Sequence, residues 1–123
     1  MRLFRWELQL QIAMIEVQCH ISISRDGTCL LSPVKTDLLN EIKRCGSLSS
    51  AAKNLKISYQ HAWTMIDEIN RSAPEPLVIK QRGGANGGGA EISDYGIKIL
   101  RDYFLIEAQV NKLISQINVD INH

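Results

Sequence analysis

The feature that most constrains this fold is residues 47–70, where two helical apolar patterns are separated by a short break. Ser47 is a good N-cap, because its hydroxyl can accept a hydrogen bond from an unpaired backbone N–H one turn later. Lys56 and Ile57 are expected to form the turn, and Ser58 to cap the second helix. The spacing predicts one helix with the buried residues Leu48, Ala51, Ala52 and Leu55, and a second with Ala62, Met65, Ile66 and Ile69.

The start of the second helix is polar on the faces that its apolar stripe leaves free. The residues concerned are Tyr59, Gln60, His61 and Thr64. This is the layout of a helix-turn-helix, in which the second helix places its N-terminal residues on base edges in the major groove. An ordinary antiparallel pair of helices would show the same pattern, so the flanking segments must decide between the two.

The preceding residues predict a hairpin. A half-buried strand is expected where Val17, Cys19, Ile21 and Ile23 alternate with polar residues. Asp26–Gly27 favours a two-residue hairpin turn, since both central positions of such a turn need a positive φ. Residues 28–31 are then the returning strand.

Another helix is expected between this hairpin and residue 47. Ser32 followed by Pro33 is a typical helix start, because proline at the first position loses no hydrogen bond. Gly46 is suited to end the helix in the left-handed conformation. Its predicted buried stripe is Val34, Leu38, Leu39 and Ile42.

A β-wing is predicted after residue 72. Pro74 and Pro76 stop the preceding helix. Residues 77–81 and 90–92 have strand character and flank a glycine-rich segment, 82–89. A nucleotide-binding loop is excluded, because the glycines match neither the G-x-G-x-x-G spacing nor a Gly-Lys-[Ser/Thr] ending. The alternative, a flexible linker, explains the flanking strands less well.

The last predicted helix begins at Ser93 and has two apolar stripes. Ile97, Leu100, Phe104 and Ala108 form the shorter one. The longer follows an a/d repeat, and its members are Ile99, Tyr103, Ile106, Val110, Leu113 and Ile117. We expect the shorter stripe to pack on its own domain and the longer to pair with a second copy. Burial of both within a monomer is the alternative.

The predicted fold is therefore mainly α with small β elements: an N-terminal hairpin, three helices, a β-wing and a long C-terminal dimerisation helix. We divide the chain into an extension at 1–15, a winged helix-turn-helix domain at 16–96 and the dimerisation helix at 97–123. Residues 1–15 fit a strand or a helix equally well. A third reading makes the first thirteen an extension from an early start codon.

Composition narrows the function classes. The net charge is +1 from 14 basic and 13 acidic residues, which argues against a histone-like polycation but permits one basic face. Three scattered cysteines without a C-x-x-C pair suit a reducing cytoplasm and match no standard metal site. No apolar run approaches the ~20 residues of a membrane span. No catalytic triad, paired carboxylates or cofactor motif is present, so we expect neither an enzyme nor a bound cofactor.

Particular motifs resemble a known family. The helix-turn-helix carries GSLSSAAK at 46–53, ISY at 57–59 and AW at 62–63. The wing region carries EPLV at 75–78, paired and triple glycines at 83–84 and 87–89, and YG at 95–96. Together they resemble the N-terminal DNA-binding domain of ModE-type, molybdenum-dependent transcription regulators, which have a LysR-like winged helix-turn-helix. The resemblance covers residues 17 to about 117.

Two departures from the family pattern concern the wing. Ile79–Lys80 stands where family members usually have Glu-Arg, and Ala85–Asn86 stands where they usually have a basic residue. Full-length members continue into β-barrel domains that bind molybdate, whereas this sequence ends at His123. The resemblance thus implies DNA binding and does not imply molybdate sensing.

The leading hypothesis is a sequence-specific transcription regulator that binds double-stranded DNA as a homodimer in a bacterial cytoplasm. Helix 58–71 would enter the major groove, and wing 80–90 would contact the backbone or minor groove. Trp63 is expected to brace the wing. The expected DNA-binding residues are Ser49, Lys53, Ser58, Tyr59, Gln60, His61, Thr64, Lys80, Arg82 and Asn86. The alternative is a protein-interaction module that needs a separate molybdate-binding partner protein.

Overall fold

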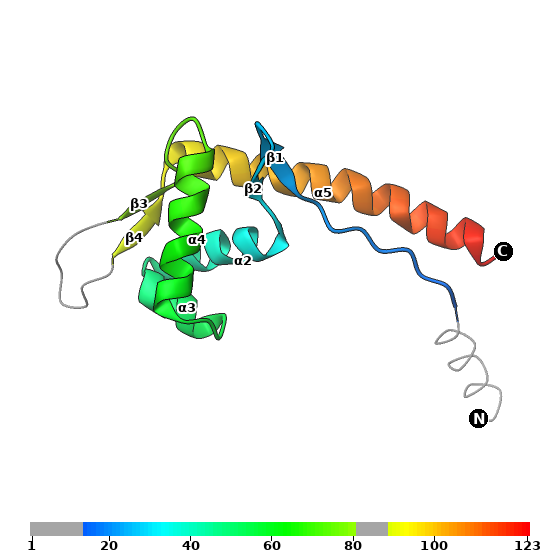
Figure 1. Cartoon of the computed structure of the whole chain (residues 1–123). Helices are drawn as coiled ribbons and strands as arrows, with labels where there is room; N and C mark the ends of the chain where they lie inside the picture. The colour runs from blue at the N-terminus through cyan, green and yellow to red at the C-terminus, as the bar shows by residue number, and fades with distance from the viewer. Residues whose placement is uncertain (1–13, 81–88) are drawn as a thin grey trace, which may run out of the picture. The chain divides into compact units, whose positions relative to one another are not determined.

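The computed structural model describes residues 14–80 and 89–123 (Figure 1). In chain order the elements are β1 (Ile23–Arg25), β2 (Thr28–Leu31), α2 (Pro33–Cys45), α3 (Leu48–Asn54), α4 (Tyr59–Ser72), β3 (Val78–Lys80), β4 (Ala90–Ile92) and α5 (Asp94–Ile121). They form two compact units. The first is residues 20–104, and the second combines residues 105–123 with residues 14–19, so that α5 contributes to both.

Serine side chains cap the three helices of the helix-turn-helix region, as predicted. Ser32 Oγ accepts from Lys35 N at 3.3 Å, and Ser58 Oγ accepts from His61 N at 3.0 Å. Ser47 Oγ accepts from a backbone N–H of α3 at 3.2 Å. Gly46 ends α2 with a φ of 67°, a left-handed conformation that glycine adopts without strain.

Helices α2, α3 and α4 bury one face each in a common core. The predicted stripe of α4 is confirmed, because Ala62, Met65, Ile66 and Ile69 are all buried. In α2 the prediction is wrong at Val34, which is 58% exposed. This residue lies in the first turn, at the edge of the face that Leu39 and Ile42 bury, and Thr36 is buried instead. The hydroxyl of Thr36 donates to two carbonyls of the preceding turn, so its burial leaves no unpaired polar atom.

The first hairpin is shorter than predicted. Asp26 and Gly27 have φ of 51° and 80°, which confirms the expected turn. The strand predicted from Val17 is wrong over residues 17–22, because β1 begins at Ile23. Ile23 pairs with Leu31, the last residue of β2, and the chain then caps α2. Among the described residues, no strand is paired with residues 17–22.

Strands β3 and β4 form the second hairpin, antiparallel and in register from Val78↔Ile92 to Lys80↔Ala90. Asn70 near the end of α4 fastens it: Oδ1 accepts from Leu77 N at 2.9 Å and Val78 N at 3.1 Å, and Nδ2 donates to Val78 O at 3.0 Å. The predicted wing tip, including Arg82 and Asn86, lies outside the described residues.

The first part of α5 closes the core of residues 20–104. Gly96, Leu100 and Tyr103 are buried, and the Tyr103 hydroxyl donates to Ile21 O at 3.0 Å. Tyr103 therefore lies in the core of its own chain, away from the exposed seam on which the sequence placed it. Ile99 also packs against this core, partly buried.

The second unit consists of an extended segment alongside the last turns of α5. The side-chain amides of Asn118 and Asn122 bond to the backbone of Val17 and Ile15. No large apolar side chain of its described residues is fully buried. Among the helices that the structure describes, none is long and apolar enough to cross a bilayer.

Candidate nucleic-acid interface

The N-terminal turn of α4 presents a row of exposed side chains. Tyr59 is 46% exposed, and Gln60 and His61 are exposed beside it. Thr64 follows one turn later, and its hydroxyl donates to Gln60 O at 3.0 Å. The opposite face of the helix is buried in the core, which fixes the direction in which these side chains point. Three of them can donate or accept hydrogen bonds through flat amide, imidazole or phenol groups.

A tight turn sets α3 against α4. Lys56 adopts a φ of 58°, and Ile57 N donates to Ala52 O at 3.0 Å, so the chain reverses within a few residues. Ser49 and Lys53 are exposed on α3. Helices α3 and α4 belong to the same compact unit and pack against each other. This is the arrangement by which a helix-turn-helix places its second helix against DNA.

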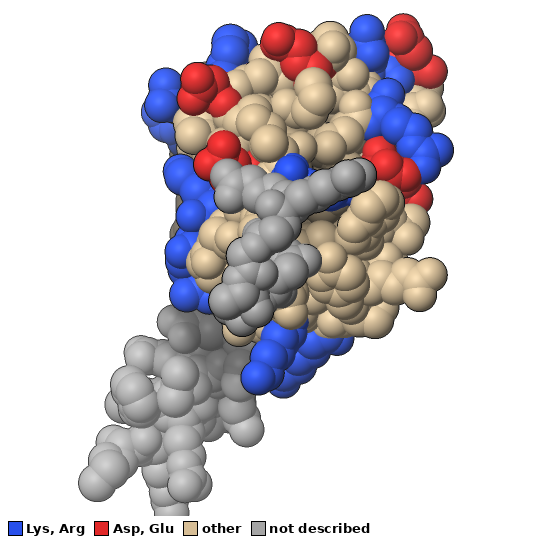
Figure 2. Space-filling model, turned by 90° about the vertical axis from the view of Figure 1, so that its left-hand side faces the viewer, with Lys and Arg blue, Asp and Glu red and all other residues tan. Residues whose placement is uncertain are grey.

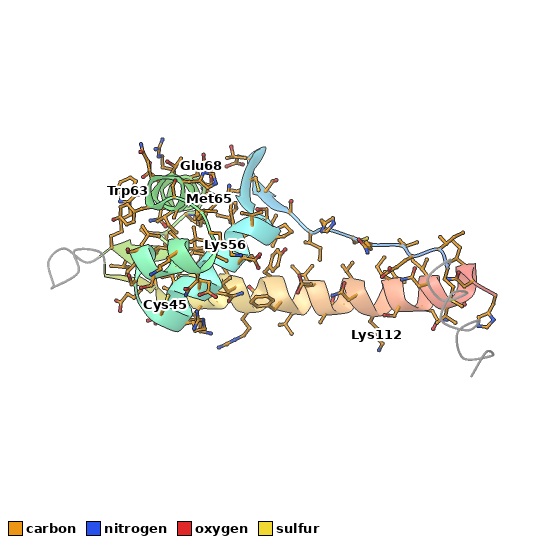
Figure 3. The ribbon with its side chains drawn as sticks, turned by 90° about the horizontal axis from the view of Figure 1, so that it is seen from below. Cys45, Lys56, Trp63, Met65, Glu68 and Lys112 are labelled. Atoms are coloured by element: carbon orange, nitrogen blue, oxygen red, sulfur yellow. The ribbon has the colours of Figure 1, made fainter. Side chains whose placement is uncertain are left out.

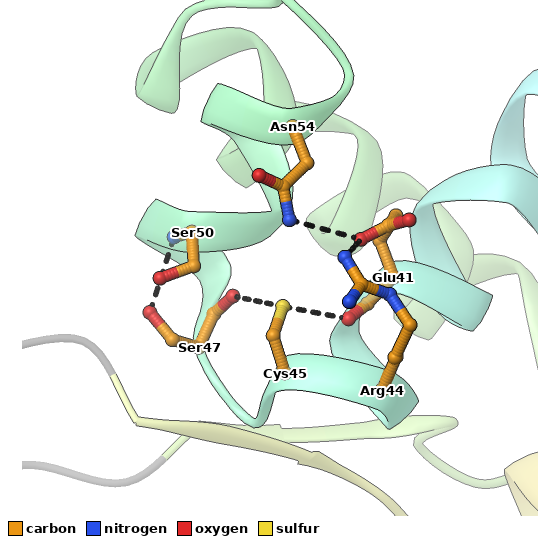
Figure 4. Close-up of polar contacts among 6 residues, drawn as sticks. All are labelled: Glu41, Arg44, Cys45, Ser47, Ser50 and Asn54. Carbon is orange, nitrogen blue, oxygen red and sulfur yellow. Dashed lines mark hydrogen bonds and ion pairs between the residues drawn. The ribbon is translucent and has the colours of Figure 1, made fainter.

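A polar network fixes α3 to the end of α2 (Figure 4). Glu41 Oε2 accepts from Arg44 at 2.6 Å and from Asn54 Nδ2 at 3.2 Å. The hydrogen bond from Arg44, followed by that from Asn54, lowers the pKa of Glu41 below its usual value. The Cys45 thiol donates to Glu41 O at 2.8 Å. The network therefore holds the last turn of α3 against the last turns of α2. Cys45 takes part in it as a hydrogen-bond donor to the backbone.

Trp63 and Lys80 connect α4 to the second hairpin. Lys80 Nζ lies 3.2 Å from the centroid of the Trp63 ring, a cation–π contact. Trp63 projects outward from α4 (Figure 3) and is 40% exposed. Nearby, Asp67 forms an ion pair with Arg71, and its pKa is lowered first by that hydrogen bond and to a lesser degree by the charge of Lys80. Trp63 thus contacts the β3 strand, as expected for a residue that braces the wing.

Charge on this side of the molecule is mixed. On the face that carries β3 and β4, Lys and Arg side chains lie mainly around the rim, with Asp and Glu among them toward the top (Figure 2). A surface of this kind can contact phosphates at its edges while uncharged side chains face the bases.

The structure brings together most of the residues predicted to bind DNA. Ser58, Tyr59, Gln60, His61 and Thr64 form the start of α4, Ser49 and Lys53 lie on the adjoining α3, and Lys80 lies over Trp63. Arg82 and Asn86 lie outside the described residues. The sequence did not predict that Asn70 fastens the β3–β4 hairpin to α4. An asparagine near the end of a helix can contact many backbone groups, and the sequence does not indicate which. Among the described residues, no group of three His, Cys, Asp or Glu side chains could hold a metal ion.

The three helices, the turn between α3 and α4 and the β3–β4 hairpin define a winged helix-turn-helix. Two solved structures share this fold at low sequence identity. ZitR of Lactococcus lactis covers 97% of this chain and 82% of its own, with a TM-score of 0.55 and 10% identity. FabT of Streptococcus pneumoniae, in complex with DNA, covers 69% of this chain and 61% of its own, with a TM-score of 0.51 and 17% identity.

In sequence, the chain is similar to ModE-type regulators, as its motifs indicated. It is 37% identical over 102 residues to the molybdenum transport protein ModE of Azotobacter vinelandii, covering 83% of this chain and 38% of the relative. It is 38% identical over 87 residues to the transcriptional regulator ModE of Haemophilus influenzae, covering 71% of this chain and 34% of the relative. The chain thus spans little more than a third of the length of these relatives. No protein-family model matches it.

Proposed function

We propose that this chain is a DNA-binding transcription regulator of the ModE type that acts as a homodimer. The observation that carries the proposal is the division of α4 into two faces. One face is fully buried in the core, and the other exposes Tyr59, Gln60 and His61 at the N-terminal end. The similarity to proteins named transcriptional regulators supports the same function. No similarity supports a module that only binds other proteins.

In this mechanism the start of α4 lies in the major groove. Gln60 can pair with adenine through both atoms of its amide, whereas His61 and Tyr59 can donate to base edges or phosphates. Ser49 and Lys53 on α3 would contact the phosphate backbone, which the first helix of such a motif crosses. Lys80 adds a cation on the side of the wing, held in place by Trp63.

A dimer places two such helices about 34 Å apart, one helical turn of DNA. The second half of α5 supplies the pairing surface. Leu113 is 61% exposed, Ile106 40% and Ile117 36%, and Val110 lies between them on the same a/d repeat. Ile99 and Tyr103 belong to the repeat by spacing but pack on their own core. The proposed seam therefore begins after Tyr103.

Fluorescence anisotropy with promoter and scrambled DNA, at several salt concentrations, tests the proposal. Gln60→Ala is expected to reduce the preference for the promoter by about 1–3 kcal/mol, because a bidentate base contact is lost. The matched control is Gln109→Ala, because Gln109 is an exposed glutamine on α5, and it should leave the affinity for both DNAs unchanged.

Lys53→Ala should weaken binding to both DNAs and lower the slope of the salt dependence by about one unit, because one phosphate contact is lost. Lys112→Ala on α5 is the control and should leave both the affinity and the slope unchanged. Equal, weak binding of both DNAs by the wild-type chain would refute the regulator.

A further inference from the structure

The exposed face of α4 carries a carboxylate near its centre. The direction of the core is defined by the four buried residues of this helix, Ala62, Met65, Ile66 and Ile69. At about 100° per residue, Gln60 and Asp67 both lie within about 30° of the direction opposite to the core. Asp67 therefore faces the same way as the glutamine that we assign to the major groove.

The spacing of the residues on this face is that of a helix that reads bases. Homeodomains read the major groove with residues at positions i, i+3, i+4 and i+7 of one helix. Counted from Gln60, these positions in α4 are Trp63, Thr64 and Asp67, and all of them are at least partly exposed. Seven residues of helix rise about 10.5 Å, the height of about three base pairs, so Asp67 can reach a base of the same site.

Two cations flank the Asp67 carboxylate. Arg71 lies one turn further along α4 and forms an ion pair with it. The hydrogen bond from Arg71, and to a lesser degree the charge of Lys80, lowers the pKa of Asp67 below its usual value. Asp67 is therefore charged at neutral pH, and its two neighbours offset its repulsion of DNA phosphates.

One oxygen of this carboxylate is available to a ligand. Among the described residues, Arg71 is the only donor to the Asp67 side chain, and it bonds to Oδ2. The side chain of Asp67 is 34% exposed, so Oδ1 can accept a hydrogen bond from a molecule that contacts this face. An ionised carboxylate accepts hydrogen bonds and cannot donate them. The site therefore selects for a donor.

We propose that Asp67 determines part of the sequence preference of this chain by accepting a hydrogen bond from the N4 amino group of a cytosine in the major groove. The inference rests on the proposed DNA-binding function and adds a base-reading residue to those at the start of α4. Arg71 is the positioning residue that holds the carboxylate in place.

The donors and acceptors of the bases select cytosine. In the major groove guanine presents only acceptors, and thymine presents an acceptor and a methyl group. Adenine presents its amino group beside the N7 acceptor, whereas cytosine presents an amino donor alone. A sequence without a cytosine opposite Asp67 leaves the carboxylate unpaired in the groove, which lowers its affinity.

Selection from a pool of randomised DNA duplexes, with sequencing of the bound fraction, tests the proposal. The full wild-type chain is expected to enrich a motif in which one position prefers cytosine about tenfold or more. Asp67→Ala should remove the preference at that position and leave the others. Asp67→Asn should shift it toward adenine, because an amide pairs with both the amino group and N7 of adenine. A merely structural role would not change which base is preferred.

Glu68→Gln is the matched control. It removes the same charge from the next residue of α4, but Glu68 pairs with Lys35 of α2 at 3.7 Å and points to a different side of the helix from Trp63 (Figure 3). Its motif should equal that of the wild type. Asp102→Asn breaks an ion pair with Lys98 on α5 and controls for the loss of such a pair between residues four apart.

Two outcomes would overturn the inference alone. The Asp67 variants could bind every sequence more tightly and keep the wild-type motif, which would mean that Asp67 only repels phosphates. The position that they change could also prefer a base other than cytosine. In both cases the proposed function stands, whereas a wild-type chain that enriches no motif refutes both. An exposed ion pair contributes little to stability, so the variants should fold, and far-UV circular dichroism verifies this.

Discussion

At the scale of single residues, the side chain of Asn70 does more than its place in the sequence suggests. Its amide bonds to Leu77 N, Val78 N and Val78 O, and so joins the end of α4 to the start of β3. Together with the contact between Trp63 and Lys80, this side chain fixes α4 to the β3–β4 hairpin.

Asn70→Ala should destabilise the chain by about 2–3 kcal/mol, because two partly buried backbone N–H groups lose their acceptor. Asn70→Asp keeps that acceptor and loses only the donor, so it should cost clearly less. Urea unfolding followed by circular dichroism measures both. Equal effects of the two variants would show that the N–H groups find other acceptors.

Glu41 gives the fold a dependence on pH. Because Arg44 and Asn54 lower its folded pKa below the unfolded value, the carboxylate contributes stability above the unfolded pKa and loses it as pH falls through the folded pKa. Glu41→Gln should therefore flatten the stability–pH curve below about pH 4.5. Asp37→Asn, an exposed carboxylate on the same helix with no ion pair to a described residue, should leave the curve unchanged. Unfolding by urea between pH 3 and pH 7 distinguishes them.

At the scale of elements, the close approach of α5 to β3 and β4 depends on Gly96. A Cβ added there would lie 2.5 Å from Leu77 O and 2.7 Å from Ile92 Cγ2. Gly96→Ala should therefore cost about 1–3 kcal/mol through overpacking, even though alanine favours a helix. Gln109→Ala controls for the gain in helix propensity. Thermal unfolding measures the effect. A higher melting temperature for Gly96→Ala than for the wild type would mean that the β3–β4 hairpin can move away from α5 to make room for the added methyl group.

The elements predicted well were those whose ends are set by local chemistry. Serine caps, the Asp26–Gly27 turn and the glycine at residue 46 act within a few residues, so their effect is visible in the sequence. The strand predicted from Val17 failed for the opposite reason. Alternation shows that a segment can be extended, but pairing depends on a neighbouring strand that ends at Leu31.

At the scale of the whole molecule, the C-terminal helix shows what periodicity leaves undecided. The a/d repeat through Tyr103 and Leu113 is regular, yet Tyr103 is buried and Leu113 is 61% exposed. Spacing places both on one face of the helix but does not say where the rest of the domain ends. The candidate DNA-binding face was predictable in its α4 part, because a buried stripe fixes the polar face opposite it. The contacts of Asn70 and Asn118 were not predictable, because they depend on the backbone of other segments. The contact of Trp63 with Lys80 agrees with the expectation that Trp63 braces the wing.

Leu113→Lys should abolish pairing in the proposed dimer, because the interface would have to bury an unpaired charge. The matched control is Leu105→Lys, since Leu105 is 58% exposed but lies on a different face of α5. Only Leu113→Lys should lose affinity for a promoter with two half-sites while it retains weak binding to a single half-site. Sedimentation velocity measures the pairing of each variant, and fluorescence anisotropy measures its affinity for the two DNAs. Equal losses for both variants would argue against the seam.

The side chains of Asn118 and Asn122 bond only to main-chain atoms of Val17 and Ile15, and this has a consequence for sequence drift. Any residue except proline supplies the same N–H and carbonyl at positions 15 and 17. The segment can therefore exchange one side chain for another while its alignment on α5 persists. Related chains that keep the two asparagines are therefore expected to keep this alignment even where the residues of the segment differ.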